Sequence, residues 1–308
     1  MSSLRDVQRL RTLTLVLDLG SISAAASVLG YTQSATSQQL RALEREVGMP
    51  LVDRSQRPLR PTPAGALLRE HVEHVLAALE GTEALLQDLR AGVLRLRVAA
   101  FGSSLSSFVP VAVRDLRRAH PQLVVHVQQL ETDEAVRRLR SGDADLAVVH
   151  HMPGAPIPET TGLVRHPLLV DRLHVLVPEG HRLARHDTIS IADLEGEPLI
   201  LPRTGTPAAR FRTVMEHLCA QAGFSPQAAY ELDDPPSAQA FVAAGIAVVP
   251  MHELMLANLP PGATSRPLTD RDAGSRVVEA LAPAGPRRAA VDDLLDKLTS
   301  AARAYSAA

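Results

Sequence analysis

The chain has 308 residues, 45% of them hydrophobic, a size that predicts two or three domains with well-formed cores. Its formal net charge of -2 argues against a protein that is basic throughout, and its single cysteine, Cys219, excludes an internal disulfide and a cysteine-rich zinc site. Without an 18-residue apolar run or a signal-peptide pattern, we expect a soluble cytoplasmic protein with no membrane partner, cofactor or bound metal.

What positive charge there is lies near the N-terminus. Residues 1–60 carry eight arginines against five acidic residues, whereas the rest of the chain carries more acids than bases. This distribution is expected if only the N-terminal segment touches DNA, although a chance fluctuation of a few charges would also produce it.

Three short helices are predicted in this segment. The first has apolar residues at every third or fourth position, at Leu4, Val7, Leu10, Leu13 and Leu17. This helix ends at Gly20. Ser21 or Ser23 can cap a second helix, which ends at Gly30. A third helix begins near Thr32 or Ser34 and runs to about Val47. Two helices joined by a short turn that contains glycine indicate a helix-turn-helix.

The third helix has two different faces. Its inner face carries Thr36, Leu40, Leu43 and Val47, which we expect to pack on the module. Its outer face is polar or basic without an acidic residue, at Gln33, Ser34, Ser37, Gln38, Arg41 and Arg45. Glutamine can bond to adenine and arginine to guanine in the major groove, so this face is typical of a recognition helix. The alternative is an ordinary solvated face, which usually mixes both signs of charge.

Residues 51–63 predict a β-wing beside the helices. A short strand, a turn with several arginines and a second strand would place Arg54, Arg57 and Arg60 against phosphates or in the minor groove.

The run from Ser21 to Gly65 resembles the DNA-binding segment of LysR-type transcriptional regulators. The matching residues are Ser21, Ala24–Ala25, Leu29, Gln33–Ser34–Ala35, Ser37–Gln38–Gln39–Leu40, Leu43–Glu44, Gly48, Leu51, Arg54, Arg57 and Thr62–Pro63–Ala64–Gly65. The resemblance implies a winged helix-turn-helix over residues 1–63 that binds double-stranded DNA through Gln33, Ser34, Ala35, Ser37, Gln38, Arg41, Arg54 and Arg57. This family usually has arginine where this chain has Gln38, so the family's base preference does not carry over to that contact.

A long linker helix is predicted over residues 64–91. Apolar positions at Leu68, Val72, Val75, Leu79, Thr82, Leu86 and Leu89 alternate spacings of four and three. Such a 3.5-residue repeat favours a partner helix along the seam, although a helix lying on its own domain is the alternative. Together with the resemblance, it predicts a homodimer through this helix, and the family pattern implies a homotetramer built from two dimers.

From residue 93 onward the pattern changes to short apolar runs alternating with helices, which predicts an α/β domain. The expected strands are 94–100, 123–128, 145–150, 173–178, 198–201, 228–232 and 247–250, and the expected helices are 108–120, 133–141, 207–222, 237–244 and 287–304.

The family resemblance implies that residues 92–308 form a two-lobed effector domain similar to periplasmic solute-binding proteins. Lobe I is expected over about 92–165 and 268–308, and lobe II over about 166–267. Ligands in α/β folds bind beyond the carboxyl ends of strands. The expected effector contacts are therefore Phe101, Ser103, Ser104, His150, Arg203, Thr204 and Thr206. For the serines and threonines, helix capping is the alternative, and for His150 the pattern favours an ordinary surface or strand-end histidine over a functional one.

Three functions remain open at this point. The first is a LysR-type regulator that binds a dyad-symmetric operator and responds to a small molecule, for which a carboxylate fits helix N-termini. The second is a DNA-binding regulator without a ligand, or one that senses redox state through Cys219. The third is an enzyme, and against it stands the lack of a phosphate-binding glycine loop, a His-Glu-x-x-His motif or a nucleophile elbow.

Overall fold

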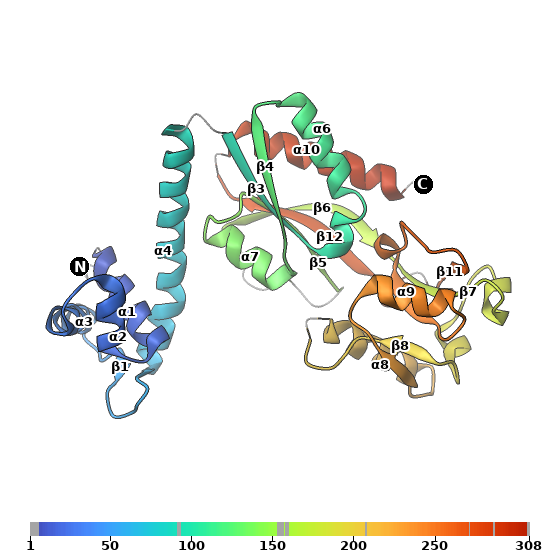
Figure 1. Cartoon of the computed structure of the whole chain (residues 1–308), viewed down its shortest axis with the longest axis horizontal. Helices are drawn as coiled ribbons and strands as arrows, with labels where there is room; N and C mark the ends of the chain where they lie inside the picture. Colours follow the sequence, from blue (N-terminus) through green and yellow to red (C-terminus); the bar gives the residue numbers. More distant parts are fainter. Residues whose placement is uncertain are drawn as a thin grey trace. The chain divides into compact units, whose positions relative to one another are not determined.

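The computed structural model describes residues 6–90, 94–152, 157, 160–206, 208–270, 272–285 and 287–306, apart from a number of side chains in the helix of residues 63–90. The chain divides into two compact units (Figure 1). One contains residues 1–93 with 140–143, and the other contains residues 94–139 with 144–308.

The first unit begins with the three predicted helices, α1 (Val7–Leu19), α2 (Ile22–Leu29) and α3 (Gln33–Val47). Each starts at a side-chain cap that accepts backbone N–H groups, from Asp6, Ser21 and Thr32. Gly20 ends α1 in the left-handed conformation, with φ at 59°. A Cβ atom at Gly20 would lie 2.5 Å from the Cβ of Pro58, so only glycine lets the wing approach α1 this closely.

The wing is a short hairpin of β1 (Val52–Asp53) and β2 (Arg60–Pro61), which pair antiparallel. It is attached to α3 by Glu44, whose Oε1 atom accepts hydrogen bonds from the backbone of Leu51 and Val52 at 3.1 and 3.4 Å. The predicted winged helix-turn-helix is therefore present, and its hairpin is held against the third helix.

The linker helix α4 (Pro63–Arg90) has two parts with different surroundings. Val72 and Leu76 are buried in the core of the helix-turn-helix, which Leu68 also contacts. The predicted seam is therefore wrong at Val72, because that side chain packs on its own unit. Farther along, apolar side chains on the seam are exposed, namely Val75, Leu79 and Leu86 with exposed fractions of 50%, 39% and 49%. The last predicted seam residue, Leu89, lies outside the described side chains.

Lobe I of the second unit is a five-stranded sheet of order β4-β3-β5-β12-β6. The strands β3 (Leu94–Ala100), β4 (Leu123–Gln129) and β5 (Leu146–His151) are parallel, and β12 (Arg276–Pro283) runs antiparallel between β5 and β6 (Leu163–Asp171). The helices α6 (Val109–Ala119) and α10 (Ala289–Ser306) cover one face, and α7 (Thr132–Arg140) covers the other. The four-residue helix α5 (Gly102–Leu105) follows β3.

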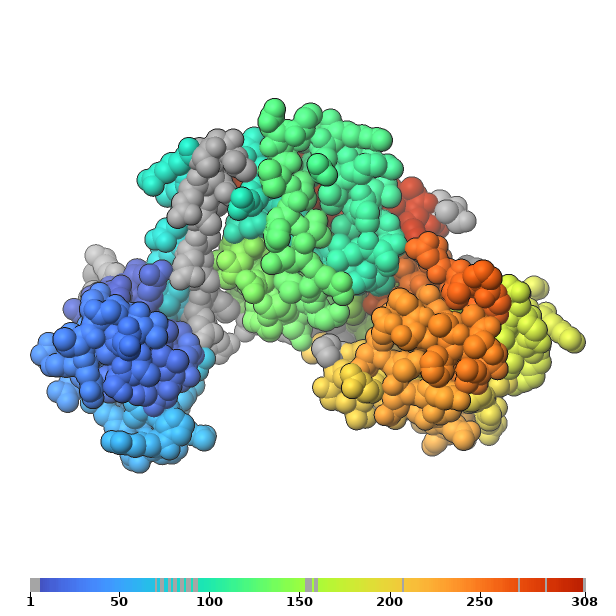
Figure 2. Space-filling view, viewed as in Figure 1, coloured from blue at the N-terminus to red at the C-terminus, as the bar shows by residue number. Residues whose placement is uncertain are grey.

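Lobe II repeats the same order of neighbours. A parallel pair, β8 (Leu199–Leu201) and β9 (Ala228–Glu231), lies beside the antiparallel strands β10 (Val249–His252), β7 (Leu173–Pro178) and β11 (Ala263–Pro267). Hydrogen bonds of Val248 with Pro198 and Ile200 join the two groups. The helices α8 (Ala209–Gln221) and α9 (Pro235–Ala243) pack on separate clusters of this lobe, and short 3-10 turns lie at η1 (Arg182–Arg185), η2 (Ile191–Leu194) and η3 (Glu253–Met255). Figure 2 shows the two lobes as distinct masses, lobe I in green and lobe II in yellow and orange.

The chain crosses between the lobes at residues other than those expected. Strand β6 stays in the sheet of lobe I up to Asp171, and β12 returns to it at Arg276. The lobe limit predicted near 165 therefore falls inside β6, and the limit predicted near 268 falls before β12, with which the chain returns to lobe I. No strand was expected at β6, β11 or β12, because Pro167 interrupts the first, the second is largely polar, and Glu279 interrupts the third.

Candidate functional site

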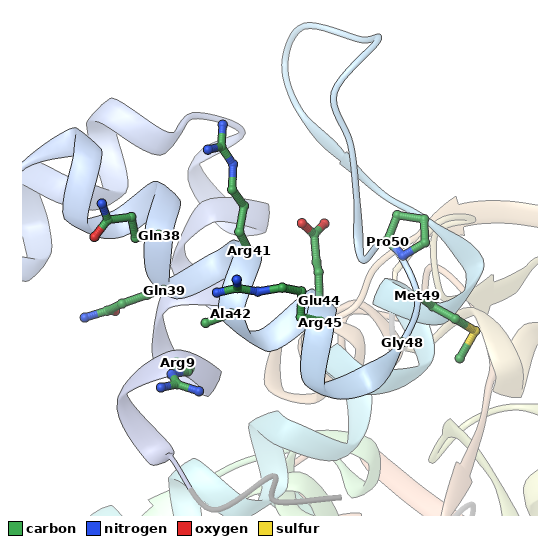
Figure 3. Close-up of a pocket in the computed structure, with 10 residues that line it drawn as sticks. All are labelled: Arg9, Gln38, Gln39, Arg41, Ala42, Glu44, Arg45, Gly48, Met49 and Pro50. Atoms are coloured by element: carbon green, nitrogen blue, oxygen red, sulfur yellow. The ribbon is translucent and has the colours of Figure 1, made fainter.

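The outer face of α3 presents polar side chains to solvent. Gln33, Ser34, Gln38 and Arg41 are exposed, while Ser37 and Ala35 are half-buried. Among the described residues the Gln38 amide makes no hydrogen bond. Figure 3 shows Gln38 and Arg41 projecting from α3 along a groove of about 1020 Å³ that Arg9 of α1 also lines. The predicted DNA-reading side chains therefore lie on one accessible surface and have donors and acceptors to offer.

The inner face of α3 holds the helix in place. Thr36, Leu40 and Leu43 are buried as expected. The neighbour of Gln38, Gln39, is half-buried and lines the same groove, but its Oε1 atom accepts a hydrogen bond of 2.6 Å from the hydroxyl of the fully buried Thr12. The acidic Glu46 is paired with Arg9 of α1. Two adjacent glutamines thus have different surroundings, one open to a ligand and the other bonded within the domain.

The wing arginines are accessible but not equivalent. Arg54 is paired with Glu44 of α3, with 2.8 Å between Nη2 and Oε2. Arg57 and Arg60 are exposed at the tip and on β2. The pair therefore holds Arg54 beside α3.

A second candidate site lies where β3 leads into α5. The Ser103 hydroxyl accepts a hydrogen bond of 2.6 Å from Nη2 of Arg276, and among the described residues its own O–H donates to no group. The Arg276 guanidinium lies over the ring of Phe101, 5.0 Å from its centroid. That ring meets His150 edge-on, with 4.7 Å between the centroids. Phe101, Ser103 and His150 are thus brought together. The Phe101 side chain is itself buried in the core of lobe I, so it positions Arg276 and His150 and does not face an effector as predicted.

Ser104 does not fit the prediction. Its side chain is fully buried, and its hydroxyl donates to the carbonyl of Phe101 at 2.7 Å. The residue therefore stabilises the turn into α5, which is the capping alternative, and is not positioned to meet an effector.

His150 is held with its ring half-buried beside Glu131, with 3.8 Å between Nε2 and the carboxylate. Burial lowers the pKa of His150 below its ordinary value and the Arg276 charge lowers it further, while the Glu131 carboxylate opposes the shift. The ring is therefore neutral at pH 7 and can donate one hydrogen bond and accept another.

The other predicted contacts form a separate group in lobe II. Arg203 is exposed and paired with Asp233, with 2.6 Å between Nε and the carboxylate. The Thr206 hydroxyl donates to the Arg203 carbonyl, and Thr204 is exposed in the same loop. The lobes meet nearby, where Arg210 at the start of α8 pairs with Asp133 at the start of α7 at 3.0 Å.

Sequence reasoning missed three buried polar residues near Ser103. Arg276 and Asp171 form an ion pair with 2.7 Å between Nη2 and Oδ2. His252 is buried, with its Nε2 atom 3.1 Å from the carbonyl of Gly274, and burial and the Arg276 charge hold its pKa well below the ordinary value. The partners in the ion pair lie 105 residues apart, so no local spacing could have indicated them.

Cys219 is fully buried in α8, and burial raises the pKa of its thiol to about 11. A reactive sensor thiol requires the opposite shift, so this position disfavours redox sensing. Within the described residues, no cluster of side chains has the composition of a metal site, and no helix is long and apolar enough to cross a membrane.

Comparisons with known proteins cover both units. The profile of the bacterial regulatory helix-turn-helix protein, lysR family, matches residues 7–66, and the profile of the LysR substrate binding domain matches residues 90–303. The transcriptional regulator ShiR of Corynebacterium glutamicum is 32% identical over 235 residues, which are 73% of this chain and 75% of ShiR.

Two solved structures share the fold. Full-length CbnR in complex with its target DNA superimposes with a TM-score of 0.62 at 21% identity, over 96% of this chain and 99% of CbnR. A full-length variant of OxyR from Pseudomonas aeruginosa gives a TM-score of 0.62 at 23% identity, over 96% of each chain.

Proposed function

The chain belongs to the LysR family of bacterial transcriptional regulators, and we propose that it binds a dyad-symmetric operator and changes that binding when a small carboxylate enters the cleft between its lobes. Like its relatives, which are named as transcriptional regulators, it is a DNA-binding regulator with an effector-binding domain and not an enzyme.

The observation that carries the DNA part is the division of α3 into an inner face that is bonded within the domain and an outer face that is free. Gln33, Gln38 and Arg41 are exposed on one side, where they can reach base edges. Ser34, Ala35 and Ser37 line the same surface and can approach the duplex. Arg54 and Arg57 would then contact phosphates from the wing.

This part is tested by selecting bound sequences from a pool of random DNA with the full-length protein. We expect a motif with two inverted half-sites about one helical turn, or a multiple of one, apart. Enrichment of a single asymmetric half-site, or of none, would contradict a dyad operator.

The exposed seam of α4 supports a dimer. Val75, Leu79 and Leu86 lie on one stripe of the helix at spacings of four and seven, and all three are exposed to solvent. A second copy of α4 would bury them and place two recognition helices on one operator. We place the association of two such dimers into a homotetramer at a groove of about 670 Å³ beside α6, which is lined by apolar residues and by Arg114, Arg117 and Arg118.

The effector part rests on Ser103. Because Arg276 donates to its oxygen, the Ser103 O–H is a polarised donor, and among the described residues it has no acceptor. A carboxylate oxygen supplies such an acceptor, and the neutral His150 ring beside Phe101 can donate a second hydrogen bond. Arg203, Thr204 and Thr206 would close on the ligand from lobe II.

A thermal-shift screen of the full-length protein tests this part with small aliphatic carboxylates, aromatic acids and amino acids. An acid at a hundred times its Kd should stabilise the protein by about 2.7 kcal/mol. The Ser103→Ala variant should lose that stabilisation. Ser106→Ala is the matched control, since Ser106 is exposed in the same turn and its hydroxyl donates only to backbone carbonyls.

If no acid stabilises the wild type, the alternative of a regulator without a small-molecule ligand gains support. If an acid stabilises Ser103→Ala as well as the wild type, the ligand binds at another place.

A further inference from the structure

Three connections between the lobes converge on Asp171. The chain leaves lobe I directly after this residue, at the end of β6. Its Oδ2 atom accepts from Arg276, the first residue of β12, where the chain returns. Its Oδ1 atom accepts from the backbone N–H of Leu254 at 3.0 Å, in the turn η3 that follows β10 of lobe II.

The turn η3 is itself docked on lobe I. The Leu254 side chain is buried in the core of lobe I, between the sheet and its helices. The hydroxyl of Tyr305 in α10 donates to the carbonyl of Glu253 at 3.1 Å, and the Glu253 N–H donates to the carbonyl of Arg172. Lobe II is therefore tied to lobe I by two chain crossings and by this turn, and the Asp171 carboxylate at the first crossing bonds to the second crossing and to the turn.

The ion pair at this point is almost completely buried. The side chains of Arg276 and Asp171 are 5% and 0% exposed. Loss of either partner would leave an unpaired charge in the interior, so the pair stabilises the arrangement of the crossings in which both charges meet. A second bond, from His252 to the carbonyl of Gly274, fixes β10 to the returning crossing.

The same guanidinium reaches the effector site. While Nε and Nη2 of Arg276 bond to Asp171, Nη2 also donates to the Ser103 hydroxyl. An unbroken chain of polar contacts thus runs from Ser103 through Arg276 and Asp171 to the Leu254 N–H. Ser103 lies at one end, where a ligand would bind, and the docked turn of lobe II lies at the other.

We propose that Arg276 and Asp171 are positioning residues that orient the Ser103 hydroxyl and couple its bonding state to the hinge between the lobes. The proposal rests on the proposed function, in which Ser103 meets the effector. When the Ser103 O–H donates to an anionic acceptor, its oxygen becomes a stronger acceptor for Arg276. Effector binding then stabilises one geometry of the hinge through Arg276, without direct contact between the ligand and η3.

Hydrogen exchange at the Leu254 amide reports on this chain of contacts, because that N–H donates to Asp171. The measurement uses the full-length protein without any ligand, so it does not depend on the effector being known. We expect Ser103→Ala to accelerate exchange at Leu254 about tenfold, the effect of weakening one hydrogen bond to a charged group. Ser106→Ala should leave it unchanged.

Asp171→Asn tests the other end and should accelerate exchange at Leu254 more than Ser103→Ala does. Its matched control is Glu279→Gln, which removes a buried carboxylate from β12 that pairs with Arg165 at 2.7 Å and bonds neither to the crossings nor to η3. This control should leave exchange at Leu254 near the wild-type rate.

The proposal is overturned if Ser103→Ala leaves exchange at Leu254 within twofold of the wild type, or if Asp171→Asn and Glu279→Gln accelerate it equally. If Asp171→Asn does not fold, the comparison of Ser103→Ala with Ser106→Ala still decides. Failure of the thermal-shift screen would refute the proposed effector class but would not change this result, so the two failures can be told apart.

Discussion

The adjacent glutamines of α3 allow recognition and stability to be separated in one experiment. Gln38 is exposed and makes no hydrogen bond among the described residues, so Gln38→Ala should leave the folded domain as stable as the wild type. On the operator, loss of a bidentate contact to adenine costs about 1–3 kcal/mol per half-site, a factor of roughly 5 to 150 in affinity for each half-site that the dimer contacts. On random DNA the change should stay within about twofold, because phosphate contacts carry that binding.

Gln39→Ala should have the opposite effects. Its side chain bonds to Thr12, which is fully buried, so its loss should cost about 0.5–1.5 kcal/mol of folding free energy. The ratio of operator to random-DNA affinity should stay at the wild-type value, since the Oε1 atom of Gln39 is bonded to Thr12, although the side chain also lines the groove.

The assay is fluorescence anisotropy with the selected operator and with a random duplex, at one fixed salt concentration, beside thermal unfolding of each variant. Equal losses for Gln38→Ala on both duplexes would refute base reading and assign this side chain to the DNA backbone. A specificity loss in Gln39→Ala would refute the division of α3 into a reading face and a packing face.

Three other predictions follow from exposure and burial. Leu79→Asp should raise the dimer dissociation constant at least about tenfold. Only the 39% of the Leu79 side chain that is exposed is left for a partner to cover, so each copy forfeits roughly 0.6–1.2 kcal/mol of apolar burial and also places a carboxylate in the seam. The exposed Leu67→Asp, off the seam, should leave the constant near the wild-type value; sedimentation at several concentrations decides, and an unchanged oligomer would refute the seam. Burial raises the pKa of Cys219 to about 11, so at pH 8 the folded chain should react with iodoacetamide at least about a hundredfold more slowly than the unfolded chain. The inert role of Cys219 would be contradicted if peroxide altered operator binding of the wild type but not of Cys219→Ala. The pKa of His252 lies well below 6.5 only in the folded chain, so below that pH the unfolded chain binds more protons and the free energy of unfolding should fall from pH 7 to pH 5. Chemical denaturation should show a shallower fall of this free energy with pH for His252→Gln. The same fall in both proteins would show that His252 does not contribute.

The DNA-binding unit was predictable because its information is local. Asp6 was not predicted as the cap of the first helix, but Ser21 and Thr32 cap the next two as expected. A glycine directly after the last residue of each helix ends it. The period of apolar residues then places each inner face. The seam of α4 was harder, because a spacing of four and three cannot tell whether Val72 meets a partner helix or the core of its own domain.

The effector domain was predictable in class but not at its hinge. Apolar runs identified strands such as β3 and β7, whose bounds match the expected ones. The hinge depends on β6 and β12, which have no clear run, and on Asp171 and Arg276, which meet only after the chain has passed through the whole of lobe II. Ser104 illustrates the opposite error, since its residue type suits ligand binding but its place in the turn makes it a structural bond.

Glu44 has a consequence for how such a protein can acquire new targets. This residue bonds to the wing backbone and to Arg54, while the residues that face outward on the same helix, such as Gln33, Gln38 and Arg41, bond to neither. Substitutions at the outer positions can therefore accumulate without loosening the hairpin. Operator preference is free to drift, or to be redesigned, on a scaffold whose integrity depends on different side chains of the same helix.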